Sequence, residues 1–431
     1  MASTDAGGMA AKGGSASIRR ILSASWIGTA VETYDFYIYG TAASLVFGPL
    51  FFPAASPSAQ LLSAYATFAV AFVARPLGGA FFGHFGDRIG RKSTLVASLL
   101  LMGLSTVLIA FLPGYGTLGW VAPALLCLLR FGQGFGLGGE WGGAVLLAVE
   151  NAPAGRRGLF GCIPLLGAPT GFLLANGLFL ILGLFLSPDQ FKAWGWRLPF
   201  LASVVLVGVG LWIRLRIGET PAFQKAIAEA EPSHVPTAEV FKRHPLPLLG
   251  ATLAVICCFA IFYLSTAFAL GWGVGTLKYD REAFLGAQLL AMLFMAMGIL
   301  AAGRLSDATS SRAVLIAGCA GTIVVGLAMG AMVISGNLTL VWAWMAAALL
   351  MMGFVYGPLG SFLPSLFPPR VRYTGVSIAF NVGGILGGGL APFVAQLLAE
   401  KGGVTPVGLY LAGAAVLSLV GLLTVKARYA D

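Results

Sequence analysis

Long apolar stretches, separated by short polar ones, follow one another along the whole chain. Each is long enough, at about 20 residues or more, for a helix to cross a hydrocarbon core of about 30 Å. The pattern predicts twelve membrane-spanning helices, at 18–48, 59–82, 93–111, 118–150, 158–186, 196–216, 246–275, 281–304, 313–334, 338–366, 372–399 and 404–426. The longest exceed the membrane thickness and must tilt, bend or project beyond it.

The polar segments predict how the chain is organised. The longest one divides the twelve spans six and six, and the two ends are too poor in apolar residues to fold by themselves. The predicted parts are a disordered tail at 1–17, an N-terminal half at 18–216, a cytoplasmic linker at 217–245, a C-terminal half at 246–426 and a second tail at 427–431.

Composition and charge agree with a membrane protein. Of the 431 residues, 58% are hydrophobic and 10% are charged, whereas about a quarter are charged in soluble domains. The net charge of +10 also suits a nucleic-acid binder, but nineteen of the 26 Lys and Arg residues lie on the tails and the even-numbered loops. Cytoplasmic loops are enriched in Lys and Arg. We therefore expect no nucleic acid, and a multi-pass protein of the bacterial inner membrane with both termini in the cytoplasm.

Cysteines and histidines show no pattern of their own. The five cysteines fall within predicted spans, where they act as small hydrophobic residues, and the three histidines are scattered over loops. Neither a disulfide framework nor a metal-ligand spacing is visible. We predict no metal site and no cofactor.

Two segments at equivalent places in the two halves resemble each other. GGAFFGHFGDRIGRK (78–92) aligns with GILAAGRLSDATSSR (298–312), which places Asp87 over Asp307. Parallel repeats are typical of one large transporter fold, whose substrate path lies between the halves. An acid at such a junction can bond the exposed amides at a helix start. We predict a gating latch, with a simple charge signal for topology as the alternative; its residues are Gly83, Asp87, Arg88, Gly90, Arg91, Asp307 and Arg312.

A run of glycines and polar residues, RFGQGFGLGGEWGG (130–143), interrupts the fourth apolar stretch. It contains the dinucleotide pattern G-x-G-x-x-G, which requires a preceding strand and a helix start. Here the pattern lies inside a predicted span, where glycines let neighbouring helices approach closely. We interpret the glycines as a packing surface and not as a nucleotide site.

Ionisable residues within the spans of the N-terminal half are candidates for function. Helical spacing groups them with polar neighbours on shared faces: Glu32, Asp35 and Tyr39; Arg130, Gln133 and Glu140; and, in the second span, Arg75. Each charge costs roughly 2.5 to 3.5 kcal/mol at membrane depth and normally faces a partner or a water-filled cavity. The three acids Glu32, Asp35 and Glu140 outnumber the two arginines by one. One carboxylate therefore has no arginine to pair with and must bind a proton or a cation. Structural ion pairing is the alternative for any single residue.

The predicted spans of the C-terminal half carry no acid or base except at their edges. Their bulkier polar residues are Tyr263, Gln288, Tyr356, Asn381 and Gln396. Such side chains suit hydrogen bonding to a substrate, although each alone is as readily part of the core.

Several motifs resemble those of one transporter superfamily. Gly83-x-x-x-Asp87-Arg88-x-Gly90-Arg91-Lys92 is similar to the loop motif of the major facilitator superfamily. Further segments resemble its metabolite:proton symporter family: VETYDFYIYG, FVARPLGG, RFGQGFGLGGEWGG, WGWRLPF, RLRIGETPAFQ and LFPPRVRYTGVSIAFNVGGILGGGLAP. GGEWGGAVLLAVENAP and LLGAPTGFLLANG are most similar to a shikimate-permease-like subgroup. The resemblance implies an all-α membrane protein with twelve transmembrane helices in two pseudo-symmetric six-helix halves.

The same resemblance implies a secondary transporter that imports a small organic anion with a proton by alternating access. The anion would be a carboxylate metabolite, shikimate-like or a di- or tricarboxylate, and one chain would suffice as a monomer in the lipid bilayer. The predicted proton-coupling residues are Glu32, Asp35, Arg130 and Glu140. The predicted substrate-binding residues are Tyr39, Arg75, Arg130, Gln133, Tyr263, Tyr356 and Asn381.

Other functions remain as alternatives. The same family includes proton symporters of zwitterionic osmolytes such as proline or betaine. A membrane-embedded enzyme would need a catalytic constellation at one interface, such as paired histidines or a nucleophile elbow, and the sequence shows none. A transport-inactive sensor would usually carry an appended soluble domain, for which the predicted tails are too short.

Overall fold

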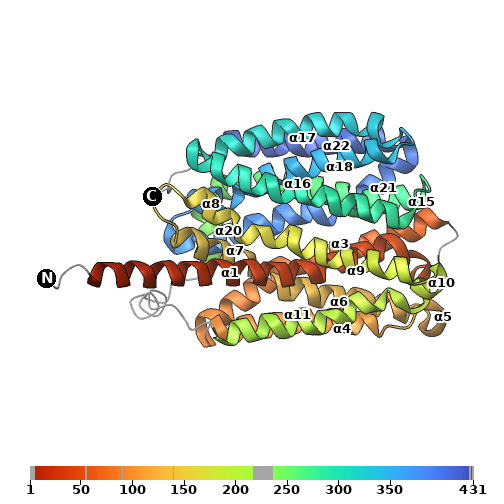
Figure 1. Ribbon diagram of the computed structural model, residues 1–431, viewed down its shortest axis with the longest axis horizontal. Coiled ribbons are helices and arrows are strands. Elements are labelled where there is room, and N and C mark those ends of the chain that lie inside the picture. Colours follow the sequence, from red (N-terminus) through yellow and green to blue (C-terminus); the bar gives the residue numbers. More distant parts are fainter. Residues whose placement is uncertain are drawn as a thin grey trace.

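The computed structural model describes residues 5–53, 56–89, 91–138, 140–216, 236–426 and residue 429. Within these residues every regular element is a helix. The long helices run roughly side by side in one bundle, and both chain ends lie at the same end of it (Figure 1). We call this the termini end and the other the opposite end.

The N-terminal half forms one group of helices. Several of its spans are interrupted by short π-helical or 3₁₀ turns. Its elements are α1 (Asp5–Ala42), η1 (Ala43–Phe47), α2 (Gly48–Phe51), α3 (Pro57–Ile89), α4 (Arg91–Ala110), α5 (Tyr115–Leu118), α6 (Val121–Leu137), α7 (Glu140–Glu150), α8 (Arg157–Cys162), η2 (Pro164–Leu166), α9 (Gly167–Phe185), α10 (Pro188–Gln190), η3 (Phe191–Gly195) and α11 (Arg197–Arg216).

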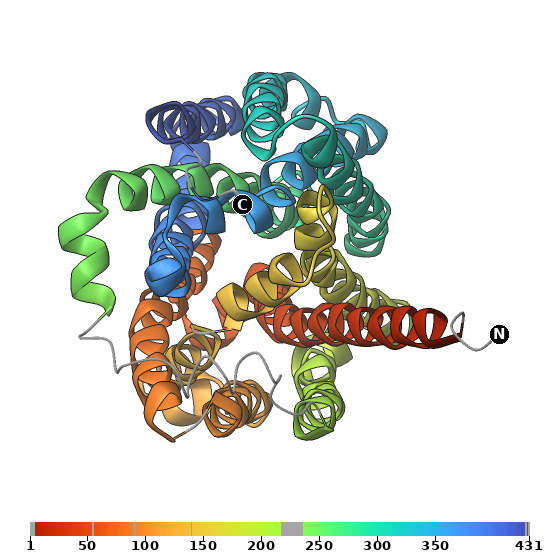
Figure 2. The same cartoon turned by 90° about the vertical axis from the view of Figure 1, so that its left-hand side faces the viewer.

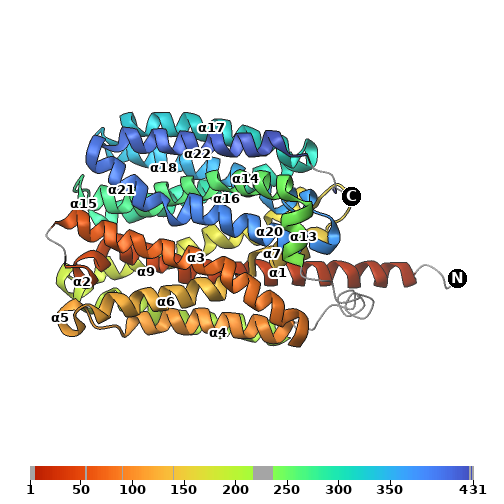
Figure 3. The ribbon, with the colours of Figure 1, turned by 180° about the vertical axis from the view of Figure 1, so that it is seen from behind.

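The C-terminal half forms a second group that faces the first, as the view from the termini end shows (Figure 2). Its elements are α13 (Pro236–Arg243), α14 (Pro245–Tyr263), η4 (Leu264–Phe268), α15 (Ala269–Gly275), α16 (Arg281–Ala308), α17 (Ser311–Val333), α18 (Leu338–Tyr356), α19 (Leu359–Phe362), η5 (Pro364–Leu366), α20 (Pro369–Gly384), η6 (Ile385–Gly389), α21 (Ala391–Gly402) and α22 (Val404–Thr424). In side view α4 and α11 lie at one edge of the bundle, and α17 and α22 lie at the other (Figures 1 and 3).

The described helices agree with the predicted twelve-span architecture. Nine helical runs are long and apolar enough to cross a membrane, and a tenth, Pro188–Gly195 with Arg197–Trp212, is bent by 46°. The other two predicted spans are helical as well. The first lies in α1, whose part within the predicted span carries the two acids Glu32 and Asp35, and the third contains the shorter apolar helix Val96–Ala110.

Two segments differ from the predicted ones. α1 begins at Asp5, inside the segment 1–17 for which we expect a tail, and the helix projects beyond the bundle (Figure 3). Once a helix has formed, each further residue adds one backbone hydrogen bond at a low entropic cost, so the helix of the first span can extend into this segment. The predicted linker 217–245 contains the helix α13, and its first part, 217–235, lies outside the described residues.

Polar residues begin several helices, and a glycine ends one. Asp280 accepts a hydrogen bond from the amide of Ala283 (2.8 Å) at the start of α16. Ser310 accepts one from the amide of Ala313 (3.2 Å) at the start of α17. These side chains satisfy amides that the helix itself leaves free. Gly403, with φ of 71°, ends α21 and lets the chain turn back into α22.

The glycines of the fourth span bring α6 against α3. A Cβ atom at Gly134 would lie 2.0 Å from the carbonyl oxygen of Ala71, and one at Gly138 would lie 2.0 Å from that of Arg75. Backbone therefore packs directly against backbone. This close approach places Arg75 of α3 beside the point where α6 ends.

Candidate functional site

A cavity of about 70 Å³ lies between the two halves. It has room for several water molecules, since one needs about 10 to 15 Å³. The N-terminal half contributes Thr29, Glu32, Thr33, Phe36, Tyr37, Arg75, Leu137, Trp141 and Ala168, and the C-terminal half contributes Cys258, Phe259, Phe262, Tyr263, Met352, Tyr356, Phe380 and Asn381. We call this the central cavity. Its walls come from α1, α3, α6, α7, α9, α14, α18 and α20.

Two charged side chains face the central cavity. Arg75 is 7% exposed, and its Cζ atom lies 4.4 Å from the ring centroids of both Phe36 and Phe72. Glu32, on the preceding helix, is 8% exposed and lies near enough to act on the charge of Arg75. The cavity thus offers one guanidinium group and one carboxyl group.

Aromatic rings form most of the remaining wall. Trp141 of α7 stacks on Phe380 of α20, with centroids 3.6 Å apart and planes 7° from parallel. Its indole nitrogen donates to the hydroxyl of Tyr356 (3.1 Å). Three helices from both halves therefore meet at this wall.

An interruption of the fourth span supplies a polar contact between the halves. α6 ends at Leu137 and α7 begins at Glu140. The carbonyl oxygen of Gly138 accepts a hydrogen bond from the side-chain amide of Asn381 (3.0 Å). Asn381 thus lines the central cavity and joins α20 to the break.

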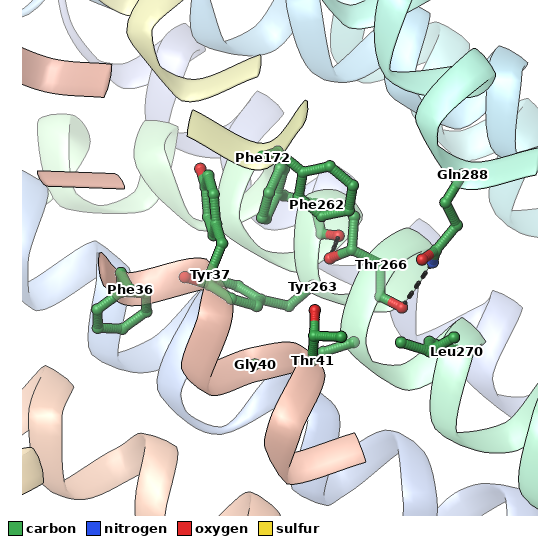
Figure 4. Close-up of a pocket in the computed structure, with 11 residues that line it drawn as sticks. Phe36, Tyr37, Gly40, Thr41, Phe172, Phe262, Tyr263, Thr266, Leu270 and Gln288 are labelled. Carbon is green, nitrogen blue, oxygen red and sulfur yellow. Dashed lines mark hydrogen bonds between the residues drawn. The ribbon is translucent and has the colours of Figure 1, made fainter. Parts of the chain in front are cut away.

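A second, smaller cavity of about 10 Å³ adjoins the first. Four aromatic residues line both: Phe36, Tyr37, Phe262 and Tyr263. Beyond them lie the polar side chains of Thr41 and Gln288 (Figure 4). Gln288 donates to the carbonyl oxygen of Thr266 (2.9 Å), in the π-helical turn η4. This space is sufficient for about one water molecule.

Arg130 lies outside the central cavity. It is fully buried, with its Cζ atom 3.7 Å from the ring centroid of Tyr39 and 4.6 Å from that of Phe36. Its Nη1 donates to Gln133 (2.9 Å), and Gln133 donates to the hydroxyl of Thr106 on α4 (2.7 Å). These contacts hold the guanidinium group inside the N-terminal half.

Asp35 is buried on another side of the same helix. It is 1% exposed and faces the hydroxyls of Thr106 and Ser203, on α4 and α11. Among the described residues, neither carboxyl oxygen of Asp35 has a hydrogen-bond partner, and the hydroxyl oxygen of Ser203 has none either. The carboxyl group is therefore separated from the central cavity by the helix that carries it.

The other predicted site residues have structural partners. Glu140 accepts a hydrogen bond from Ser98 (2.7 Å) on α4, and the hydroxyl of Tyr39 bonds that of Thr67 (2.5 Å). Neither they nor Gln133 line the central cavity. Of the predicted residues the structure brings five together at the cavity: Glu32, Arg75, Tyr263, Tyr356 and Asn381.

The sequence analysis did not assign a role to several lining residues. Tyr37, Phe259, Phe262 and Phe380 are aromatic residues in a chain where 12% are aromatic, so their type carries little signal. Trp141 shares the stripe of Arg130 by spacing and could have been found that way. Within the described residues, no group of three His, Cys, Asp or Glu side chains could hold a metal ion.

At the termini end, the halves meet through Asp307 of α16. Its two carboxylate oxygens accept hydrogen bonds from the amides of Gly158 (2.6 Å) and Leu159 (3.1 Å) in the first turn of α8. Arg312 instead donates to the carbonyl oxygen of Leu422 (2.8 Å), within the C-terminal half. Gly90 and the side chains at 83, 87, 88 and 91 lie outside the described part of the chain.

At the opposite end, other contacts join the halves. The carbonyl oxygen of Ala267, in the π-helical turn η4, accepts hydrogen bonds from Ser44 (3.0 Å) and Tyr65 (2.8 Å). Ser58 of α3 donates to Glu400 of α21 (2.5 Å). Contacts between the halves therefore lie at both ends of the bundle, with the central cavity between them.

Comparison with known proteins gives relatives along nearly the whole chain. Residues 25–392 match the family model of the Major Facilitator Superfamily. The chain is 46% identical to the inner membrane metabolite transport protein YhjE of Escherichia coli, with 94% of this chain and 93% of that protein covered. It is 37% identical to the shikimate transporter of Escherichia coli (95% and 94% covered). It is 32% identical to the proline/betaine transporter of Salmonella typhimurium (94% and 82% covered).

Solved structures share the fold. The structure of the proton:xylose symporter XylE from the same superfamily, bound to a bromodeoxyglucose, aligns with a TM-score of 0.76 at 16% identity, covering 95% of each chain. At this identity the likeness concerns the fold alone. The chain belongs to the major facilitator superfamily, as a multi-pass membrane transporter and not an enzyme, and the cavity between its two helical halves agrees with this.

Proposed function

We propose that this transporter carries a small organic anion, a carboxylate, together with a proton by alternating access. The observation that supports this most directly is Arg75, the arginine on the wall of the central cavity. Its Nε atom has no hydrogen-bond partner among the described residues, and a guanidinium group binds carboxylates with paired, charge-assisted hydrogen bonds. The amide of Asn381 and the hydroxyls of Tyr263 and Tyr356 could then bond hydroxyl groups of the substrate.

Asp35 is the proposed proton carrier. An ionised carboxylate buried without a partner would cost several kcal/mol, so the arrangement around Asp35 suits the protonated acid. The hydroxyl of Ser203 could donate to the carboxylate once the proton leaves. Arg130 is connected to the same region through Gln133 and Thr106 and can offset the charge that then appears.

Alternating access requires that the contacts at the two ends break in turn. We propose that the termini end faces the cytoplasm, in agreement with the distribution of Lys and Arg. The bonds of Asp307 to α8 would then close the inner side, and those of Ala267 and Glu400 would close the outer side. The structure, with contacts between the halves at both ends, would then be an intermediate between the two open states.

The proton assignment can be tested by substitution in proteoliposomes with radiolabelled shikimate. Asp35→Asn keeps the side-chain shape but cannot release a proton, so we expect it to retain shikimate exchange and to lose accumulation driven by a pH gradient. Glu32→Gln is the comparison, because Glu32 lies on the cavity wall. Normal pH-driven accumulation by both variants would contradict the proposed coupling.

One observation supports a zwitterion as a second candidate substrate. The central cavity holds the carboxyl group of Glu32 as well as Arg75, and aromatic rings attract quaternary ammonium groups. Competition against shikimate uptake distinguishes the two classes, with shikimate, citrate, proline and glycine betaine each added in excess. Stronger inhibition by proline or betaine than by the carboxylates would replace the anion with a zwitterion.

A further inference from the structure

The proposed substrate site and proton site occupy separate places. Arg75 lines the central cavity, whereas Arg130 and Asp35 do not. In a symporter the two binding events must still alter each other's affinity. Phe36 of α1 contacts both arginines and also lines the cavity.

The ring of Phe36 is shared by the two guanidinium groups. The Cζ atom of Arg75 lies 4.4 Å from its centroid, and that of Arg130 lies 4.6 Å from it. Ring faces attract cations within about 6 Å, most strongly where water is excluded. Nε and Nη2 of Arg130 and Nε of Arg75 have no hydrogen-bond partner among the described residues. Aromatic rings therefore supply much of what stabilises these two charges.

A short chain of polar groups leads from Arg130 to Asp35. Arg130 donates to Gln133, and Gln133 donates to Thr106, which faces Asp35. An ionised Asp35 would attract Arg130 and draw it away from Phe36. A protonated Asp35 would leave Arg130 on the ring, which is where Arg130 lies in the structure.

We propose that Phe36 is a positioning residue that couples substrate binding to proton binding. A carboxylate on Arg75 offsets the charge of that arginine and so reduces its repulsion of Arg130. Arg130 is then more stable on the ring of Phe36, the position that accompanies protonated Asp35. Substrate and proton therefore favour each other's binding. This inference rests on the proposed function, in which Arg75 binds the substrate and Asp35 the proton.

Among the described residues, the groups near Asp35 and Phe36 that carry a charge or a titratable proton include Glu32, Tyr34, Tyr37 and Tyr39 of α1, Arg75 of α3, Arg130 of α6 and Tyr263 of α14. α4 and α11 face Asp35 with uncharged hydroxyls. Arg130 is the arginine that is connected to Asp35 through Gln133 and Thr106, so its position is the one proposed to respond to the charge of Asp35.

Two substitutions test the ring itself. Phe36→Leu keeps an apolar side chain but removes the ring, whereas Phe36→Tyr keeps the ring. In purified protein, the carbonyl stretch of protonated Asp35 is followed by infrared spectroscopy and assigned by its loss in Asp35→Asn. We expect the band to disappear in Phe36→Leu at a pH about one unit lower than in the wild type, because Arg130 is free to move toward Asp35. Phe36→Tyr should behave as the wild type.

Phe262→Leu is the matched control, since Phe262 lines the same cavity while Arg75 and Arg130 lie over other rings. Its band should keep the wild-type pH dependence. Added shikimate should raise the pH at which the Asp35 band disappears in the wild type, and should not raise it in Phe36→Leu. Equal behaviour of Phe36→Leu and Phe262→Leu would overturn the role of the ring and leave the proposed function standing. A protein in which Asp35→Asn removes no band would overturn the proton site itself.

Discussion

Chemically identical side chains have different environments in this protein. Arg75 and Arg130 are both nine-tenths or more buried, yet the first lines the central cavity and the second is enclosed by Phe36 and Tyr39. Glu32 and Asp35 differ in the same way, although only one turn of α1 separates them. The difference that matters for function is whether the charged group lines the central cavity, because only such a group can bind a substrate.

The role of Arg75 is testable at the level of one residue. Loss of a charge-assisted hydrogen bond costs about 1.5 to 3 kcal/mol, so Arg75→Gln should raise the KM for shikimate by roughly 10- to 100-fold. Arg75→Lys keeps the charge without the planar guanidinium group, so its KM for shikimate should lie between those of the wild type and Arg75→Gln. Counterflow of radiolabelled shikimate measures both. An unchanged KM in Arg75→Gln would remove this residue from the substrate site.

At the scale of elements, interruptions of helices create the polar contacts between the halves. Between α6 and α7, the carbonyl oxygen of Gly138 accepts a hydrogen bond from the side chain of Asn381. The π-helical turn η4 presents that of Ala267 to Ser44 and Tyr65. Such turns often occur at functional sites, because they leave backbone groups without intrahelical partners. Separation of the halves must break these bonds.

The cap formed by Asp307 on α8 gives a prediction for one such contact. A cap contributes about 0.5 to 2 kcal/mol, so Asp307→Ala should favour the state that is open at the termini end. The native thiol of Cys162 is fully buried beside Gly303 of α16 and reports this opening. We expect maleimide labelling of Cys162, followed by mass spectrometry, to become several-fold faster.

Arg312→Gln is the control for that measurement. Arg312 lies at the same end of the bundle but bonds a carbonyl oxygen within its own half. Its loss should leave the labelling rate of Cys162 near the wild-type value. If Asp307→Ala labels no faster than Arg312→Gln, the cap does not hold the halves together.

At the scale of the whole molecule, contacts between the halves lie at both ends of the bundle, with the central cavity between them. Transport by alternating access predicts that fixing one end closed blocks the cycle. The double variant Ser58→Cys/Glu400→Cys can be cross-linked by a short reagent that forms a disulfide bond with each thiol. Cross-linking should abolish shikimate uptake, and a reductant that cleaves the disulfides should restore it. Each single variant treated alike is the control. Full uptake by the cross-linked protein would contradict a moving outer gate.

Much of the architecture could be predicted from the sequence. The thickness of the bilayer fixes the length of an apolar span, so hydrophobic runs such as 313–334 agree closely with the observed helix α17. The assignment to the major facilitator superfamily is confirmed by the family model that matches residues 25–392. It could be predicted because the motifs that carry it are local in the sequence. The roles of the individual site residues stay predictions.

What the sequence by itself determined is the number of spans, the family and the set of ionisable residues buried in the membrane, because each follows from local composition and spacing. Only the tertiary structure decided which of those residues meet. Helical spacing relates Glu32 to Asp35 but does not fix the rotation of α1 within the bundle, and that rotation turns Glu32 to the cavity and Asp35 to α4 and α11. Rotation and close approach depend on packing among distant segments, such as Gly134 against Ala71.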